Sequence, residues 1–302
     1  MSFSATDAAF EGFRLVRRNP MALAAWTLVY LIYTLAALFA SGGMMRSMAV
    51  WMEQVEALEN GPAPTSPEAF APIMESYFAA MSHMLWAIPL SMIISAVLMA
   101  AVVRAVLQPE AGGFGYLRLG MDEVRAFVVT LVIGILTAVA AAVVFLVAGI
   151  AGGVAVASFE GWGVLVMVLA MLAAGAFLIW LVVRWSLAIP ITVAEKRFAI
   201  FDSFAMTKGR FWPLLGMAVI AGVMALVVML LCGLISMPVS MMGGMSMFAG
   251  MNADDPAEVF RNFNPTNPWM IASAVINAIV YALILAVMYA PFSVAYREIK
   301  GG

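Results

Sequence analysis

Six long apolar segments dominate the chain, and shorter polar stretches separate them. An α-helix rises 1.5 Å per residue, so a helix that crosses a hydrocarbon layer about 30 Å thick needs about 20 mostly apolar residues. Backbone polar groups in lipid must be paired inside the segment, which a helix achieves. The six segments contain no Asp or Glu. The pattern predicts spans at residues 20–41, 85–107, 127–152, 163–184, 213–236 and 269–292.

Two connections are long and amphipathic, at residues 42–84 and 237–268. In the first, apolar side chains from Met44 to Leu58 recur at helical spacing, and Arg46, Glu53 and Glu56 lie on the opposite face. The second is rich in methionine and glycine. We expect structured outer loops at both places, because long connections in compact proteins usually have structure or a purpose.

A short pattern recurs before the spans. Residues 9–13 and 200–204 share a Phe, acid, Phe spacing, each followed by a base and a span, and residues 122–125 form a weaker third copy. This repetition predicts three helical hairpins, each led by an interfacial amphipathic helix. The second leading helix is expected at residues 194–208.

Prolines and small residues mark further features of the spans. Pro89 is the expected kink, whereas Pro190 and Pro291 lie near expected helix ends. Gly134, Ala138 and Ala142 form a ridge at four-residue spacing, which is typical of close packing between membrane helices.

Composition agrees with a lipid environment, because 65% of the residues are hydrophobic and only 11% are charged. So apolar a chain cannot hide its surface in a water-soluble core. We therefore expect one all-α integral membrane domain over residues 1–302, built as a six-span helical bundle.

The charges divide sharply between the two sides of the predicted spans. One side has thirteen Lys and Arg against eight acids, a net charge of +5, and the other has Arg46 and Arg261 against nine acids, a net charge of −7. Basic residues favour the cytoplasmic side, so both termini are expected there, as in a bacterial-type inner-membrane protein. The basic rim should attract the anionic headgroups of membrane lipids.

Few polar groups lie within the spans, so these are the candidates for substrate contact. Asn277, Ser91 and Ser95 are expected either to bind a ligand or to join helices. Arg104 and Arg184, near cytoplasmic ends, are expected to snorkel to the interface, with a substrate clamp as the alternative. The spans contain no acid or histidine, which disfavours a proton relay.

Methionines suggest a second chemistry at the outer face. Thioethers select soft ions such as Cu(I) or Ag(I). The candidate ligands are Met44, Met45, Met48, Met241, Met242, Met245 and the single histidine, His83. The alternative is that these flexible side chains serve only as adaptable apolar surface.

Enzymatic signatures are missing from the sequence: it has no Gly-x-Ser-x-Gly elbow, no zinc-binding His pair and no phosphate-binding loop. No enzyme activity and no cofactor are expected. Nucleic-acid binding is not expected either, because the basic residues follow a membrane rim.

Three short motifs support a comparison with a known family: the Phe-acid-x-Phe lead, Tyr116-Leu117-Arg118-Leu119-Gly120, and the run from Arg184 to Pro190. Together they resemble polytopic bacterial families related to the membrane domain of glycerophosphodiester phosphodiesterases. The resemblance implies a six-helix membrane module, in some relatives fused to a soluble catalytic domain whose residues have no counterparts in this sequence.

Three functions remain open. The first is binding or moving a lipid or other amphiphile, or supporting an envelope complex. The second is binding or transport of Cu(I) or Ag(I) at the methionine-rich outer face. The third is a scaffold subunit that contacts a membrane or envelope partner, or a second copy of the chain.

Overall fold

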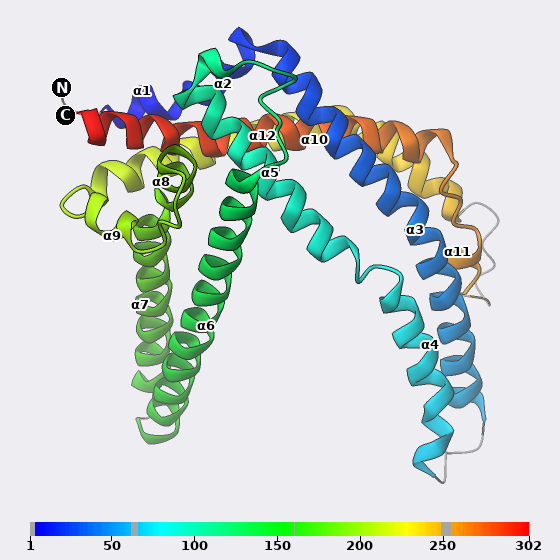
Figure 1. Ribbon diagram of the computed structural model, residues 1–302. Helices are drawn as coiled ribbons and strands as arrows, with labels where there is room; N and C mark the ends of the chain where they lie inside the picture. The colour runs from blue at the N-terminus through cyan, green and yellow to red at the C-terminus, as the bar shows by residue number, and fades with distance from the viewer. Residues whose placement is uncertain (1–3, 62–65, 160, 249–254, 256, 302) are drawn as a thin grey trace. The chain divides into compact units, whose positions relative to one another are not determined.

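The computed structural model describes residues 4–61, 66–159, 161–248, 255 and 257–301, and every regular element in them is a helix (Figure 1). The all-α fold predicted from the sequence is therefore confirmed. The predicted outer connections at residues 42–84 and 237–268 lie partly outside these residues.

In this part of the chain, six helices are long and apolar enough to cross a membrane, so the chain is a multi-pass membrane protein. They contain the predicted spans, except that α5 begins two residues after the predicted residue 85. The helices are α3 (Pro20–Asn60), α5 (Ala87–Leu107), α6 (Met121–Ser158), α7 (Trp162–Trp185), α10 (Phe211–Phe248) and α12 (Pro268–Gly301). Several exceed the expected span, because α3 continues through Gly42 and Gly43 and α10 continues through Pro238. These two helices continue into the stretches that the sequence analysis treated as outer loops.

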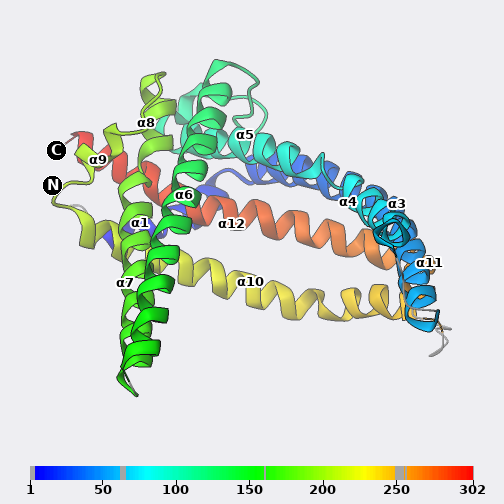
Figure 2. The same cartoon turned by 90° about the horizontal axis from the view of Figure 1, so that it is seen from below.

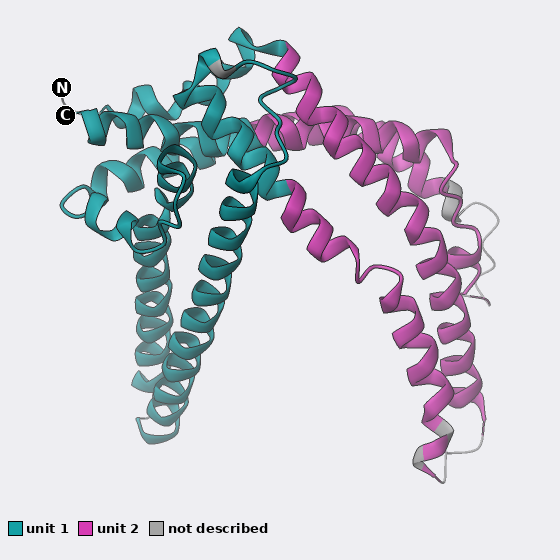
Figure 3. Ribbon diagram, in the orientation of Figure 1, with its two compact units in different colours: residues 1–20, 95–225, 285–302 teal, residues 21–94, 226–284 magenta. Residues whose placement is uncertain are grey.

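The helices contribute to two compact units, coloured separately in Figure 3. Unit 1 comprises residues 1–20, 95–225 and 285–302, and unit 2 comprises residues 21–94 and 226–284. Helices α5, α10 and α12 each have residues in both units.

A hairpin of α6 and α7 is a prominent part of unit 1, and the two helices lie side by side in Figures 1 and 2. Glycine makes the close approach possible near the turn. A Cβ on Gly163 would collide with the backbone of Ala155 and Val156, and one on Gly152 would lie 2.6 Å from Met167 Cγ. The expected ridge at Gly134 does not serve this purpose, because a Cβ there would meet nothing within 4 Å.

The start of the chain packs on α12 in unit 1. Helices α1 (Ala5–Ala9) and α2 (Glu11–Arg18) bury Ala9, Gly12 and Leu15. A Cβ on Gly12 would lie 2.7 Å from the carbonyl oxygen of Ala286, so only glycine lets α2 approach the α12 backbone this closely.

The remaining leading helices differ from the sequence-based expectation. Instead of one helix at residues 194–208, the chain forms α8 (Ala188–Glu195), a left-handed residue at Lys196 and the short α9 (Asp202–Met206). The prediction was wrong because Lys196 takes a positive φ that ends the helix. The third leading sequence, at residues 122–125, belongs to the first turns of α6.

In unit 2, the outer stretch after residue 41 is largely helical. It contains the end of α3, the 3₁₀ helix η1 (Pro67–Phe70) and α4 (Ala71–Ser82). Ser76 Oγ donates a hydrogen bond to Gln54 Oε1 at 2.7 Å, and the rings of Trp51 and Tyr77 lie 6.2 Å apart, so α4 pairs with the end of α3. The short α11 (Glu258–Arg261) precedes α12.

Prolines act differently from the expectation. Pro89 lies in the first turn of α5, where the missing N–H costs no helical hydrogen bond, so it starts the helix and does not kink a span. Pro190 is likewise the third residue of α8. Pro291 lies inside α12, which continues to Gly301.

Candidate functional site

An apolar cavity of about 420 Å³ lies within unit 1. Its walls come from α5, α6, α7, α10 and α12, together with Ser186 and Ile189 near the start of α8. Apolar side chains such as Met99, Met288 and Phe292 form most of the lining, and no lining residue carries a charge. Cavities of this size and character typically bind small apolar molecules.

The polar groups in this wall are few, and one of them has no partner. Trp185 is only 8% exposed, and its indole N–H finds no acceptor among the described residues. A buried donor without a partner costs about 1–3 kcal/mol. The indole nitrogen is itself buried, so an acceptor on a ligand would reach it only once neighbouring side chains move aside.

Three of the four hydroxyl groups in the same wall donate to backbone carbonyls. Thr130 Oγ1 donates to the carbonyl oxygen of Ala126 at 2.8 Å, and Thr137 Oγ1 donates to that of Ile133 at 2.7 Å. Ser186 Oγ donates to the carbonyl oxygen of Val183 at 2.8 Å. The fourth, the hydroxyl of Tyr289, donates to no other described residue, so the wall can serve an acceptor there and a few donors at the hydroxyl lone pairs.

The structure also explains the open space beside α6. Gly134 lines this cavity, and a Cβ on it would meet no atom within 4 Å. The absence of a side chain at this position leaves room in the cavity.

A second cavity, of about 450 Å³, lies within unit 2 between α3, α10 and α12. Asn277, which the sequence predicted as a possible ligand contact, is one of five polar side chains in its lining. The other four are Thr34, Ser240, Ser273 and Tyr281.

The other predicted substrate residues do not join Asn277. Ser91 belongs to unit 2 and donates to the carbonyl oxygen of Ile88 at 2.7 Å. Ser95 is half-buried in unit 1 and is not among the residues that line the cavities described above. Neither arginine lines these two cavities.

Arg104 is buried and not snorkelling, so that expectation was wrong. Its side chain is only 2% exposed, pairs with the buried carboxylate of Glu123, and donates to the carbonyl oxygen of Tyr116 at 2.9 Å. Glu123 also accepts from the backbone N–H of Gly120 at 2.9 Å. The pair fixes the loop between α5 and α6, where Tyr116 has a positive φ of 57°.

Arg184 holds α9 near the end of α7. Its Nη1 lies 3.3 Å from the carbonyl oxygen of Phe204 and 3.3 Å from Thr207 Oγ1, and its guanidinium lies 5.3 Å from the ring centre of Trp180. Its Nε has no acceptor among the described residues.

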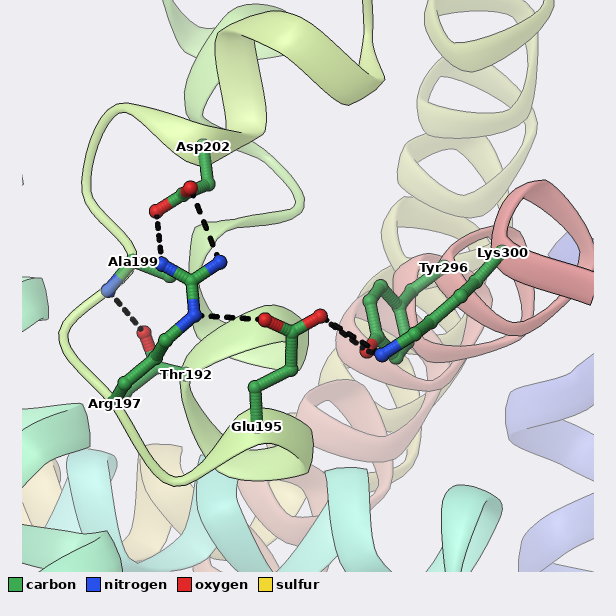
Figure 4. Close-up of polar contacts among 7 residues, drawn as sticks. All are labelled: Thr192, Glu195, Arg197, Ala199, Asp202, Tyr296 and Lys300. Atoms are coloured by element: carbon green, nitrogen blue, oxygen red, sulfur yellow. Dashed lines mark hydrogen bonds and ion pairs between the residues drawn. The ribbon is translucent and has the colours of Figure 1, made fainter.

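Charged side chains join the ends of α8 and α12, beyond the predicted spans (Figure 4). Lys300 Nζ donates to Glu195 Oε1 at 2.8 Å, and Tyr296 donates to the same oxygen at 3.2 Å. Lys300 lowers the pKa of Glu195, and the carboxylate in turn raises the pKa of Lys300. Arg197 bridges Glu195 and Asp202, and Asp202 raises the pKa of Arg197.

The candidate metal ligands all belong to unit 2. His83 packs on α3 against Gly43, where a Cβ would lie 2.8 Å from His83 Nδ1. Gly43 directly precedes Met44 and Met45 in the sequence. Met241, Met242 and Met245 are exposed on α10, and Met48 is half-buried. Among the described residues, no three His, Cys, Asp or Glu side chains gather as a metal site.

Comparisons with known proteins give no relative: no family model, curated protein or solved structure matches the chain. The resemblance to the membrane domain of glycerophosphodiester phosphodiesterases therefore stays a prediction.

Proposed function

We propose that this protein binds or moves a lipid or other amphiphile without catalysing a reaction, and that the ligand's apolar part occupies the unit 1 cavity. The largely apolar and uncharged wall of this cavity carries the proposal, and the unpartnered indole N–H of Trp185 adds a hydrogen-bond donor beside it. The cavity's volume of about 420 Å³ suits a segment of an amphiphile. A carbonyl or ether oxygen on that segment would accept from Trp185.

Charge supports the choice of ligand. A charged group in this cavity would be buried without a counter-charge, because no lining residue is ionised at neutral pH. The bound segment is therefore neutral, and any charged headgroup lies outside it.

The proposed location is a bacterial-type inner membrane with both termini in the cytoplasm, where basic residues would meet anionic headgroups. Green fluorescent protein fused to the C-terminus should fluoresce, and an alkaline phosphatase fusion at the same position should be inactive. The reverse result would invert the topology.

Filling the cavity tests the proposal. Gly134→Leu puts a side chain into the cavity without striking a neighbour, and Gly175→Leu is its control. Gly175 lies in α7 of the same unit, does not line the cavity and also has open space around a Cβ. Native mass spectrometry after mild extraction should show amphiphile adducts on the wild type and on G175L but not on G134L. Equal adducts on all three would refute the proposal.

The hydrogen bond has its own test. Trp185→Phe keeps the ring and removes the donor, which should weaken binding of a monoacylglycerol about fivefold, the equivalent of one net hydrogen bond of about 1 kcal/mol. A hydrocarbon of the same chain length should bind both proteins equally. Equal loss for both ligands would mean that the substitution alters the cavity's shape.

Metal binding is the second proposal, and the position of His83 against Gly43, which precedes Met44 and Met45 in the sequence, favours it. The triple change of Met241, Met242 and Met245 to Leu should abolish Cu(I) binding and preserve the fold. Unchanged affinity would refute it.

A membrane or envelope partner, or a second copy of the chain, is the third proposal, and deletion of residues 237–268 should release that partner.

A further inference from the structure

Polar side chains from three helices make up half of the residues that line the cavity of unit 2. Ser273, Asn277 and Tyr281 follow one another at four-residue intervals on α12, so they form one stripe along the helix. Thr34 of α3 and Ser240 of α10 complete the polar lining. In a segment that is otherwise apolar, this concentration of hydrogen-bonding groups calls for a partner.

Asn277 is the group with most to gain from a ligand. Its carboxamide makes no hydrogen bond with any other described residue and is exposed at the cavity wall. An amide has two donors and one acceptor, and leaving them unpaired in hydrocarbon is costly. A ligand that both donates and accepts would satisfy all of them.

The remaining hydroxyls match the same kind of ligand. Thr34 Oγ1 donates to the carbonyl oxygen of Tyr30 at 2.9 Å, so its lone pairs are left to accept. Ser240 and Ser273 lie 3.4 Å apart across the cavity, where one hydroxyl donates to the other. The cavity therefore presents donors and acceptors in similar measure.

The uncharged lining of the cavity and an aromatic ring in it limit the kind of ligand that the cavity can bind. The cavity is lined by no ionised side chain, so a phosphate or an ammonium group would have no counter-charge. Tyr281 adds an aromatic face, and its ring pairs with that of Tyr30 at 5.9 Å between centroids. Hydroxyl-rich molecules such as sugars and polyols donate and accept at their edges and present an apolar C–H face to a ring.

From these observations we infer that the unit 2 cavity is a binding site for a neutral, hydroxyl-rich group, either the headgroup of a glycolipid or a free sugar or polyol. This site is distinct from the apolar cavity of unit 1 and does not depend on the function proposed for it.

Methionine methyl groups report on the two cavities separately. Met270 lines the unit 2 cavity, whereas Met99 and Met288 line that of unit 1. The protein would be labelled at its methionine methyl carbons, reconstituted in nanodiscs and titrated with octyl glucoside, octyl phosphate, octyltrimethylammonium and glucose. Single Met→Leu changes would assign the three signals.

Two variants and one control test the site. Asn277→Leu removes the amide, and Gly244→Leu fills the cavity from α10, where a Cβ meets nothing within 4 Å. Gly233→Leu is the control, because Gly233 lies in the same helix and unit with equally open surroundings and does not line the cavity.

We expect the Met270 signal to shift saturably with octyl glucoside and not with the two charged amphiphiles. The dissociation constant should rise at least about tenfold in N277L and G244L and stay unchanged in G233L. A response to octyl glucoside alone assigns the site to a lipid headgroup, and a response to glucose as well assigns it to a free sugar.

Three results would overturn the inference. One is a Met270 shift that is equal for all three headgroups or never saturates. Another is unchanged affinity in both N277L and G244L. The third is a change in native mass from dimer to monomer in N277L, which would mean that Asn277 pairs with a second copy of the chain. Normal Met99 and Met288 signals in each variant show that the fold is intact.

Discussion

Removing one partner of the buried pair of Arg104 and Glu123 should be among the most destabilising single changes in unit 1. The two side chains are 2% and 6% exposed, so neither is screened by solvent. Glu123→Gln removes the negative charge but keeps an acceptor oxygen, so the guanidinium stays hydrogen-bonded and is left buried without a counter-charge. Breaking such a pair from one side costs about 3–5 kcal/mol. That is a large fraction of the about 5–15 kcal/mol typical of folded proteins.

The assay is reversible unfolding in mixed micelles, followed by circular dichroism. Asp122→Asn is a matched control, because Asp122 is adjacent in sequence and pairs with Arg125 at 2.8 Å. That pair is more than 20% exposed on both sides and is therefore worth about 0–1 kcal/mol. The expected order is a large loss for E123Q and a small one for D122N.

A double variant separates the charge from the packing. Arg104→Met with Glu123→Leu leaves no buried charge, so it should recover most of the stability that E123Q loses. If E123Q lost no more than D122N, the pair would be solvated and the assigned burial would be wrong.

Two further changes test other contacts. Gly163→Leu should lower the free energy of unfolding by about 1–3 kcal/mol, because the new side chain would overpack against Ala155 and Val156. Gly153→Leu is the control, since a Cβ on Gly153 would meet nothing within 4 Å. Equal effects of the two changes in thermal unfolding would contradict the hairpin packing. Because Lys300 lowers the pKa of Glu195, their contribution to stability is present above the unfolded pKa of glutamate and is lost as pH falls through the lowered folded value. Glu195→Gln should therefore flatten the acid side of the stability profile, and a profile identical to that of the wild type would contradict the pairing.

Membrane helices were predictable from the sequence because their signal is local. Each apolar window identifies itself, and six of six were found in the described chain. The ends of α3 and α10 were not predictable in this way, since α3 continues through Gly42 and Gly43 and α10 through Pro238, residue types that often end helices. The break at Lys196 depended on a left-handed backbone that the sequence does not announce, because lysine rarely takes it.

Candidate sites were harder to predict, because they depend on which helix faces meet. Asn277 stood out as a polar residue in an apolar span, and it lines a cavity. Trp185 was missed: a tryptophan at a span's end is ordinarily an interfacial anchor, and only the packing around it leaves its N–H without an acceptor. Arg104 was misread for a similar reason, since Glu123 lies 19 residues away. The pairing of Arg104 with Glu123 in the next helix depends on tertiary packing, which the local sequence does not reveal.

The α6–α7 hairpin also bears on the order of biosynthesis. Its contacts join residues close in sequence, such as Gly152 with Met167, so it can form as soon as both helices have left the ribosome. The unit 2 cavity takes its walls from Thr34 near the beginning and Tyr281 near the end of the chain. Any ligand of that cavity must therefore wait until α12 has been made and has packed beside α3 and α10.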